Sequence, residues 1–180
     1  LYMAAYRFTP KPDAWYEAGP NGFRTSYPAK QSYMAKVKTA NYLPNALMIR
    51  EAGEYGKDTP FCFDEEFFLA ESAIANVCLV NQDGVLEVPE FHHALPGTTM
   101  LRGLELIEGK VPNRFRRLRE GDLDRARELL LLGTGPDCVA ITSYEGKPVG
   151  DGKEGPVARL MRQLIREDIP RTGVPVPGLE

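Results

Sequence analysis

Short apolar runs separated by turn residues dominate the chain, and they predict many short strands with a few helices. Residues 1–8 predict a buried strand, and the Pro- and Gly-rich stretch 9–21 predicts a loop. Alternation of side chains over 32–39 predicts a second strand. Apolar runs at 61–63, 67–70, 76–80 and 85–88 predict four more. Gln82-Asp83-Gly84 predicts a hairpin turn between the last two, because Asp-Gly readily takes positive φ.

Helical patterns lie between and after these strands. Residues 42–55 predict a helix that has Asn41 as its N-cap, Pro44 in its first turn and Gly56 as its stop. Its expected apolar stripe consists of Leu43, Ala46, Leu47 and Ile49. Further helices are predicted at 98–108, 122–130 and 156–165. A hairpin turning at Glu145-Gly146 is predicted before the last helix, and the tail 173–178 is predicted to be extended.

The mixture of strands and helices without strict alternation predicts an α/β or α+β domain. A length of 180 residues fits one domain, and 43% hydrophobic residues are enough for a sizeable core. The chain opens on Leu1 inside an apolar run, not on methionine. We therefore expect these residues to be part of a longer polypeptide.

Charge and cysteine usage narrow the class of protein. A net charge of −3 argues against a nucleic-acid partner, and the basic run 114–119 is followed at once by acidic residues, as on a solvated helix or loop face. Cys62, Cys78 and Cys138 are far apart and odd in number, which favours a reducing cytoplasm. No apolar run reaches the ~20 residues of a membrane span. His92 and His93 lack a third ligand at suitable spacing, so we expect no metal.

One lysine region and one carboxylate carry candidate chemistry. A lysine in a cofactor cleft can form a Schiff base, although most lysines are simply solvated. Lys38 and Lys36 lie on the same face of the predicted strand, so periodicity does not separate them, and Lys30 is a further rival by position. Glu71 follows an apolar run; it either marks a strand end that points to water or pairs with a cationic ligand group.

Two turns offer candidate anion sites. Leu95-Pro96-Gly97-Thr98-Thr99 opens a predicted helix, whose free N–H groups and dipole favour an anion. Gly133-Thr134 follows a leucine run and can also donate backbone N–H groups to a phosphate. Each signal is weak by itself, since many such turns bind nothing.

In this order and spacing, the four segments resemble class-IV aminotransferases, the fold-type-IV pyridoxal-phosphate enzymes that include branched-chain aminotransferase, D-amino-acid transaminase and aminodeoxychorismate lyase. The resemblance runs from about Lys38 to Ile165. The Lys-x-x-Asn-Tyr spacing selects Lys38 over Lys36 as the catalytic, cofactor-bearing lysine. It implies pyridoxal 5′-phosphate as cofactor, bound by Lys38, Tyr42, Glu71, Ser72, Asn76, Leu95, Gly97, Thr98, Thr99, Gly133 and Thr134.

The resemblance also implies an architecture and an activity. The expected fold is the large domain of that family, a mixed sheet or pseudo-barrel with flanking helices over residues 1–180. The family's small N-terminal domain, with a phosphate-binding arginine, has no counterpart in this sequence. The implied reaction is transfer of an amino group between a branched-chain or D-type amino acid and a 2-oxo acid, in a cytoplasmic homodimer. Aminodeoxychorismate lyase and a non-catalytic fragment are the alternatives.

The sequence departs from the family pattern at two positions near these segments. Ser72 stands where the family usually has glycine, and Arg102 stands three residues beyond Thr99, whereas the family commonly places an arginine directly after that threonine. Neither departure removes a residue expected to contact the cofactor.

Overall fold

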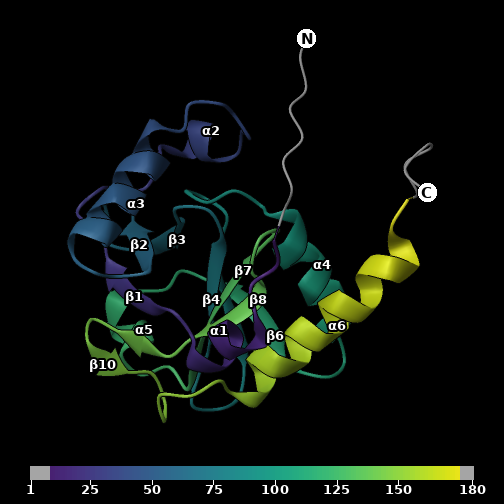
Figure 1. Cartoon of the computed structure of the whole chain (residues 1–180). Coiled ribbons are helices and arrows are strands. Elements are labelled where there is room, and N and C mark those ends of the chain that lie inside the picture. The colour runs from purple at the N-terminus through teal and green to yellow at the C-terminus, as the bar shows by residue number, and fades with distance from the viewer. Residues whose placement is uncertain (1–8, 175–180) are drawn as a thin grey trace.

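Two five-stranded sheets form the centre of the computed structural model, which describes residues 9–174 (Figure 1). The first sheet has the order β10 (Lys147–Pro148), β9 (Ser143–Tyr144), β1 (Asn21–Arg24), β2 (Thr59–Phe63) and β3 (Leu69–Ser72). The second has the order β6 (Asn113–Arg116), β5 (Leu86–Pro89), β4 (Asn76–Val80), β7 (Glu128–Gly133) and β8 (Asp137–Ile141). Both sheets are mixed: β1 runs parallel to β2 and β9, and β5 runs parallel to β6.

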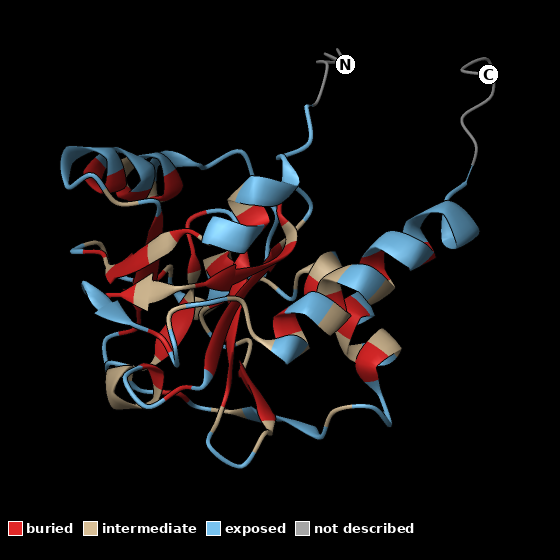
Figure 2. Cartoon of the chain, turned by 60° about the horizontal axis from the view of Figure 1, so that its bottom comes forward, coloured by how far each residue is buried: buried red, intermediate tan, exposed pale blue. Residues whose placement is uncertain are grey.

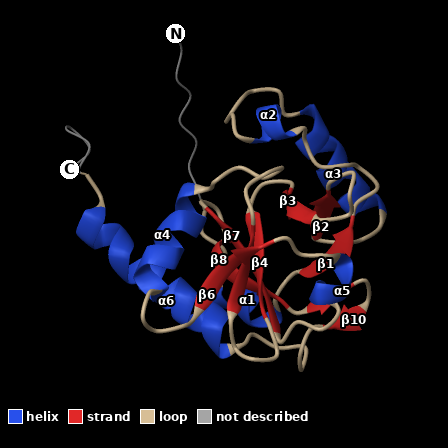
Figure 3. Ribbon diagram, turned by 180° about the vertical axis from the view of Figure 1, so that it is seen from behind, coloured by secondary structure: helices blue, strands red, loops and turns tan. Residues whose placement is uncertain are grey.

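Helices flank these sheets, which confirms the expected mixed fold class. They are α1 (Asp13–Ala18), α2 (Ser32–Ala35), α3 (Leu43–Glu54), α4 (Thr98–Ile107), α5 (Glu120–Leu123) and α6 (Pro156–Thr172). Figure 3 shows α4 and α6 together beside the second sheet and α3 beside the first. None of the helices between residues 9 and 174 is long and apolar enough to cross a membrane.

The two central strands of the second sheet are buried on both faces. In β7, Leu129 and Leu131 point into the core between the two sheets, whereas Leu130 and Leu132 point into the core under α4 and α6. In β4, Val77 and Cys78 divide in the same way. Successive strand residues face opposite sides, so a strand covered on both sides needs a continuous apolar run. Figure 2 shows these strands as the buried centre of the molecule.

This double burial explains a wrong prediction. The run that ends at residue 132 was expected to complete a helix over 122–130, but the structure has the short helix α5 followed by β7. A buried strand and a buried helix segment have the same uninterrupted apolar pattern over a few residues, so periodicity does not distinguish them.

The strand predicted at 32–39 is also wrong. Residues 32–35 form α2, and only Ala35 on that stretch is buried, while Tyr33 and Val37 are 75% and 58% exposed. The alternation therefore does not reflect one buried face. Lys36 and Lys38 do not share a strand face either.

Three smaller expectations also change. The loop expected over 9–21 contains α1, and β1 follows it. The basic run forms β6, an edge strand whose Arg114 and Arg116 pair with the buried carboxylate of Glu87. The expected strand at 1–8 and most of the extended tail lie outside the described residues.

Several predicted elements are confirmed. Strand β4 and the start of α4 at Thr98 lie where the sequence places them, and α6 begins at Pro156 but extends to Thr172. The turn residues Gly84 and Gly146 both have positive φ, as hairpins of these types require. Pro44 lies in the first turn of α3, but Tyr42, not Asn41, is its N-cap.

Helix α3 buries polar residues where an apolar stripe was expected. Its buried residues are Asn45, Met48, Glu51 and Ala52, while Leu43 and Ile49 are 65% and 44% exposed. The Glu51 carboxylate accepts hydrogen bonds from the Ser26 N–H at 3.1 Å and from the Thr25 hydroxyl. These bonds hold the segment after β1 against α3.

The carboxylate of Glu128 caps the N-terminus of α6. It accepts hydrogen bonds from the N–H groups of Val157 and Ala158 at 3.1 and 2.9 Å, and Gly155 makes room for it, since a Cβ there would lie 2.1 Å from the Glu128 Cδ. A negative charge at a helix N-terminus also interacts favourably with the helix dipole.

We predict that Glu128→Ala lowers the free energy of unfolding by roughly 1–3 kcal/mol, because it leaves two buried N–H groups without acceptors. Denaturant titration measures the change. The exposed Glu108→Ala serves as the control and is expected to shift stability by less than ~0.5 kcal/mol. Equal effects for the two variants would contradict the capping role.

Candidate active site

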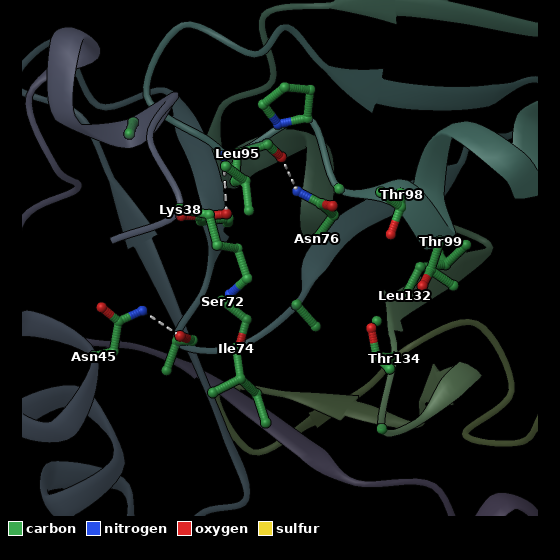
Figure 4. Close-up of a pocket in the computed structure, with 18 of the residues that line it drawn as sticks. Lys38, Asn45, Ser72, Ile74, Asn76, Leu95, Thr98, Thr99, Leu132 and Thr134 are labelled. Carbon is green, nitrogen blue, oxygen red and sulfur yellow. Dashed lines mark hydrogen bonds between the residues drawn. The ribbon is translucent and has the colours of Figure 1, made fainter. Parts of the chain in front are cut away.

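A pocket of about 490 Å³ lies where the β3–β4 turn, the end of β7 and the start of α4 meet. The segment between α2 and α3 forms its remaining wall. Figure 4 shows Lys38, Ser72 and Ile74 on one side, with Thr98, Thr99 and Thr134 on the other. The structure brings all residues predicted to bind the cofactor to this one pocket: Lys38, Tyr42, Glu71, Ser72, Asn76, Leu95, Gly97, Thr98, Thr99, Gly133 and Thr134.

Glu71 places a carboxylate in this pocket from strand β3. Its Oε2 accepts a hydrogen bond from the Leu95 N–H at 3.1 Å. Burial raises the pKa of Glu71 to about 7, and this outweighs the opposing effects of the Leu95 hydrogen bond and of the Lys30 and Lys38 charges. A carboxylate in this condition is stabilised by any cationic group that enters the pocket.

Asn76 holds the neighbouring turn in place. Its Nδ2 donates to the Leu95 carbonyl at 2.8 Å, and Figure 4 shows this bond beside the one from Leu95 to the carboxylate. Its Oδ1 lies against Gly97, where an added Cβ would come within 2.1 Å of it. Gly97 therefore has to be glycine for Asn76 to keep this position, and Asn76 joins β4 to the start of α4.

The N-terminus of α4 points free donors at the pocket. Gly97 is its N-cap and supplies no side-chain acceptor, so the N–H groups at the first turn, with the Thr98 and Thr99 hydroxyls, are available to a ligand. Facing it, Gly133 ends β7 so close to Ala75 that an added Cβ would lie 3.0 Å from that methyl group. The two turns form a concave set of donors suited to an anion.

The lysine rivals separate in the structure. Lys38 and Lys30 line the pocket, whereas Lys36 lies at the C-terminus of α2, is exposed and does not line it. Lys38 lies on the irregular segment between α2 and α3, and its side chain reaches into the pocket (Figure 4). Tyr42 lies near the rim and is 43% exposed.

Two pocket residues were not predicted as functional. The buried Asn45 donates its Nδ2 to the Ala73 carbonyl and so fixes the β3–β4 turn from α3, while its buried Oδ1 has no partner among the described residues. Ile74, at the tip of that turn, is 59% exposed and lines the pocket. A polar residue on the inward face of α3 is the only sequence signal for Asn45, and it becomes visible once that face is known.

Residues noted for other reasons lie away from the pocket. Arg102 makes a two-point ion pair with Asp168, at 2.8 and 2.7 Å, that joins α4 to α6. His93 instead donates to the Lys30 carbonyl. Within residues 9–174, no group of three or more His, Cys, Asp or Glu side chains is arranged to hold a metal ion. Cys62, Cys78 and Cys138 are buried free thiols in this range.

Comparison with known proteins agrees with this geometry. The family model described as amino-transferase class IV matches residues 1–144. The chain belongs to the class IV aminotransferases. Because the match covers every predicted site residue, the two donor turns and the Glu71 strand belong to a segment that the family shares.

Individual relatives of this class IV chain are full-length enzymes. A chloroplastic D-amino-acid transaminase of Arabidopsis thaliana is 33% identical over 158 residues, covering 84% of this chain and 42% of that protein. A branched-chain-amino-acid aminotransferase of Escherichia coli K12 is 31% identical, with coverages of 84% and 47%. A solved T.th. branched-chain amino acid aminotransferase, complexed with N-(5′-phosphopyridoxyl)-L-glutamate, superimposes with a TM-score of 0.81 at 26% identity over 85% and 52%. The chain spans about half the length of these relatives.

The raised pKa of Glu71 predicts a pH-dependent stability. The folded chain holds the proton up to about pH 7, whereas the unfolded chain releases it near the ordinary value of 4.5. Burial of this group therefore costs nothing below pH 4.5, and stability falls as pH rises between 4.5 and 7, by up to ~1.4 kcal/mol per pH unit.

We predict that Glu71→Gln removes this dependence, so that the variant is more stable than the unaltered chain at pH 8 and loses that advantage by pH 4.5. Chemical denaturation of the protein without added ligands at both pH values measures it. Exposed Glu65→Gln is the matched control and should show no such pH-dependent difference. A Glu71→Gln variant that is equally destabilised at both values would show that Glu71 is an ordinary ionised carboxylate.

Proposed function

We propose that this chain is the cofactor-binding domain of a pyridoxal-phosphate-dependent aminotransferase, which moves an amino group between a branched-chain or D-type amino acid and a 2-oxo acid. The observation that carries the proposal is the partly buried Glu71 carboxylate in the same pocket as Lys38 and the N-terminus of α4. These groups offer an acceptor for a cationic ring nitrogen, an amine and an anion site. Family membership supports the same reaction class.

The residues present fit pyridoxal phosphate by the chemistry of their donors and acceptors. Glu71 has a raised pKa and no cation in direct contact among the described residues, so a protonated pyridine nitrogen would relieve the cost of ionising it. The first turn of α4 and the Gly133-Thr134 turn would hold the phosphate. Ser72 and Asn76 fix the loop between Glu71 and this turn: the Ser72 N–H donates to the Ala75 carbonyl at 2.9 Å.

Bound pyridoxal phosphate supplies a conjugated ring that takes up electrons from the substrate's Cα, and the protein supplies position and charge. Lys38 holds the cofactor through its Nζ and, once freed by the incoming amino group, moves a proton between the substrate Cα and the cofactor C4′ carbon. Glu71 keeps the ring nitrogen protonated, and the Tyr42 hydroxyl donates to the phenolic oxygen. Leu95 packs on the ring.

The wider setting of the domain belongs to the same proposal. We propose that residues 1–180 are the large domain of a cytoplasmic homodimer in amino-acid metabolism, and that further polypeptide completes the substrate pocket. The coverage of only about half of each full-length relative supports a second domain. Free buried cysteines suit a reducing compartment.

Covalent labelling of Lys38 tests the central step. Incubation of the protein with pyridoxal phosphate, reduction with borohydride and peptide mapping should place the pyridoxyl group on Lys38. Lys38→Arg should abolish the label, because a guanidinium does not form the reducible bond, and Lys36→Arg should leave it unchanged. Label distributed over exposed lysines, or retained in Lys38→Arg, would contradict the assignment.

A Lys38 label by itself shows cofactor binding, and turnover tests the reaction. Purified protein is assayed for transfer from branched-chain and D-amino acids to 2-oxoglutarate. Transfer that disappears in Lys38→Arg supports the aminotransferase. Specific labelling of Lys38 with no transfer from any amino acid would exclude that activity for this chain while leaving the cofactor site intact.

A further inference from the structure

Lys30 is a second lysine in the pocket that the proposed chemistry leaves without a role. The charged residues that line the pocket are Lys30, Lys38 and Glu71, counted among the described residues. Lysine is usually a fully solvated surface residue, but Lys30 is only partly exposed. A cation that faces a ligand pocket has a chemical consequence there.

The backbone at Lys30 is fixed from two sides. The Ala29 N–H donates to the Phe63 carbonyl at 2.9 Å, which ties this segment to the end of β2. The His93 ring donates from Nδ1 to the Lys30 carbonyl at 2.9 Å, which ties it to the loop that carries Leu95. Further upstream, Glu51 on α3 holds Ser26. These bonds hold the base of the side chain in place beside the pocket.

The ammonium of Lys30 lies next to Tyr42 and has no carboxylate close by. Its Nζ lies 5.9 Å from the centre of the Tyr42 ring, and none of the described carboxylates lies within 4.0 Å of it. Other cations of the protein are paired: Arg114 with Glu87, and Arg162 with Glu154. The effect of Lys30 on the pKa of Glu71 agrees with an ammonium directed at this side of the pocket.

We propose that Lys30 binds the carboxylate of the amino-acid or 2-oxo-acid substrate, an inference that rests on the aminotransferase function proposed above. Every such substrate carries this negative group. Lys38 has to be an uncharged amine when it takes a proton, so it cannot supply the opposing charge. The donors of α4 and of the Gly133-Thr134 turn serve the phosphate. Lys30 is the remaining cation among the described pocket residues.

Paired probes separate carboxylate binding from an indirect effect through Glu71 or Tyr42. We measure by calorimetry the binding of 4-methylvaleric acid and of its uncharged amide, 4-methylvaleramide, to protein loaded with pyridoxal phosphate. In Lys30→Met the acid should bind roughly ten- to a hundredfold more weakly, as expected for loss of a hydrogen bond to a charged group, and the amide should bind unchanged. Lys30→Arg should recover most of the affinity for the acid.

Lys36→Met is the matched control, since Lys36 is exposed and does not line the pocket. Equal losses for acid and amide in Lys30→Met, or no loss for either, would overturn the inference while borohydride labelling at Lys38 in the same preparations leaves the proposed function standing. If unaltered protein shows no label at Lys38, the proposed function fails and the role of Lys30 fails with it.

Discussion

The site depends on one carboxylate that the fold keeps away from water and leaves without a cation in direct contact among the described residues. Glu71 reaches the pocket from β3, and burial raises its pKa to about 7. Its hydrogen bond from the Leu95 N–H is too little to offset that cost. The cost is a standing reason for the pocket to take up a cationic ligand, and it is the kind of local instability that functional sites carry.

Two groups of buried polar contacts keep that carboxylate in position. Asn76 bonds the Leu95 carbonyl and packs against Gly97, so that β4, the turn and α4 move as one unit. On the other side, the buried face of α3 uses Asn45 to hold the β3–β4 turn. Polar groups on an inward helix face are costly unless each finds a partner, which is why they appear here as anchors for loops that carry the site.

The sequence predicted best where a segment's local pattern and its tertiary role agree. Strand β4 and the start of α4 are bounded by turn residues and were placed correctly. β7 was mistaken for a helix because burial on both faces removes the alternation that identifies a strand. The polar inward face of α3 was missed because nothing local says which loops it must hold.

The candidate site shows the same division. Short motifs brought its predicted residues together correctly in one pocket, because each motif lies wholly on a turn or strand end, but periodicity left Lys38 tied with Lys36. The spacing to Asn41 and Tyr42 resolved the tie, and the structure adds that Lys36 is away from the pocket. Lys30 was seen only as a rival, since its place beside Tyr42 depends on contacts with β2 and His93 that no local pattern encodes.

The most direct measurement of this account is the titration of the Glu71 carboxyl by carbon-13 NMR, with and without pyridoxal phosphate, using Glu71→Gln to assign its signal. The account predicts a midpoint near pH 7 in the free protein. With the cofactor bound, the signal should stay that of an ionised carboxylate well below that pH. A midpoint near the ordinary value of 4.5 in the free protein, or one that the cofactor leaves unchanged, would contradict it.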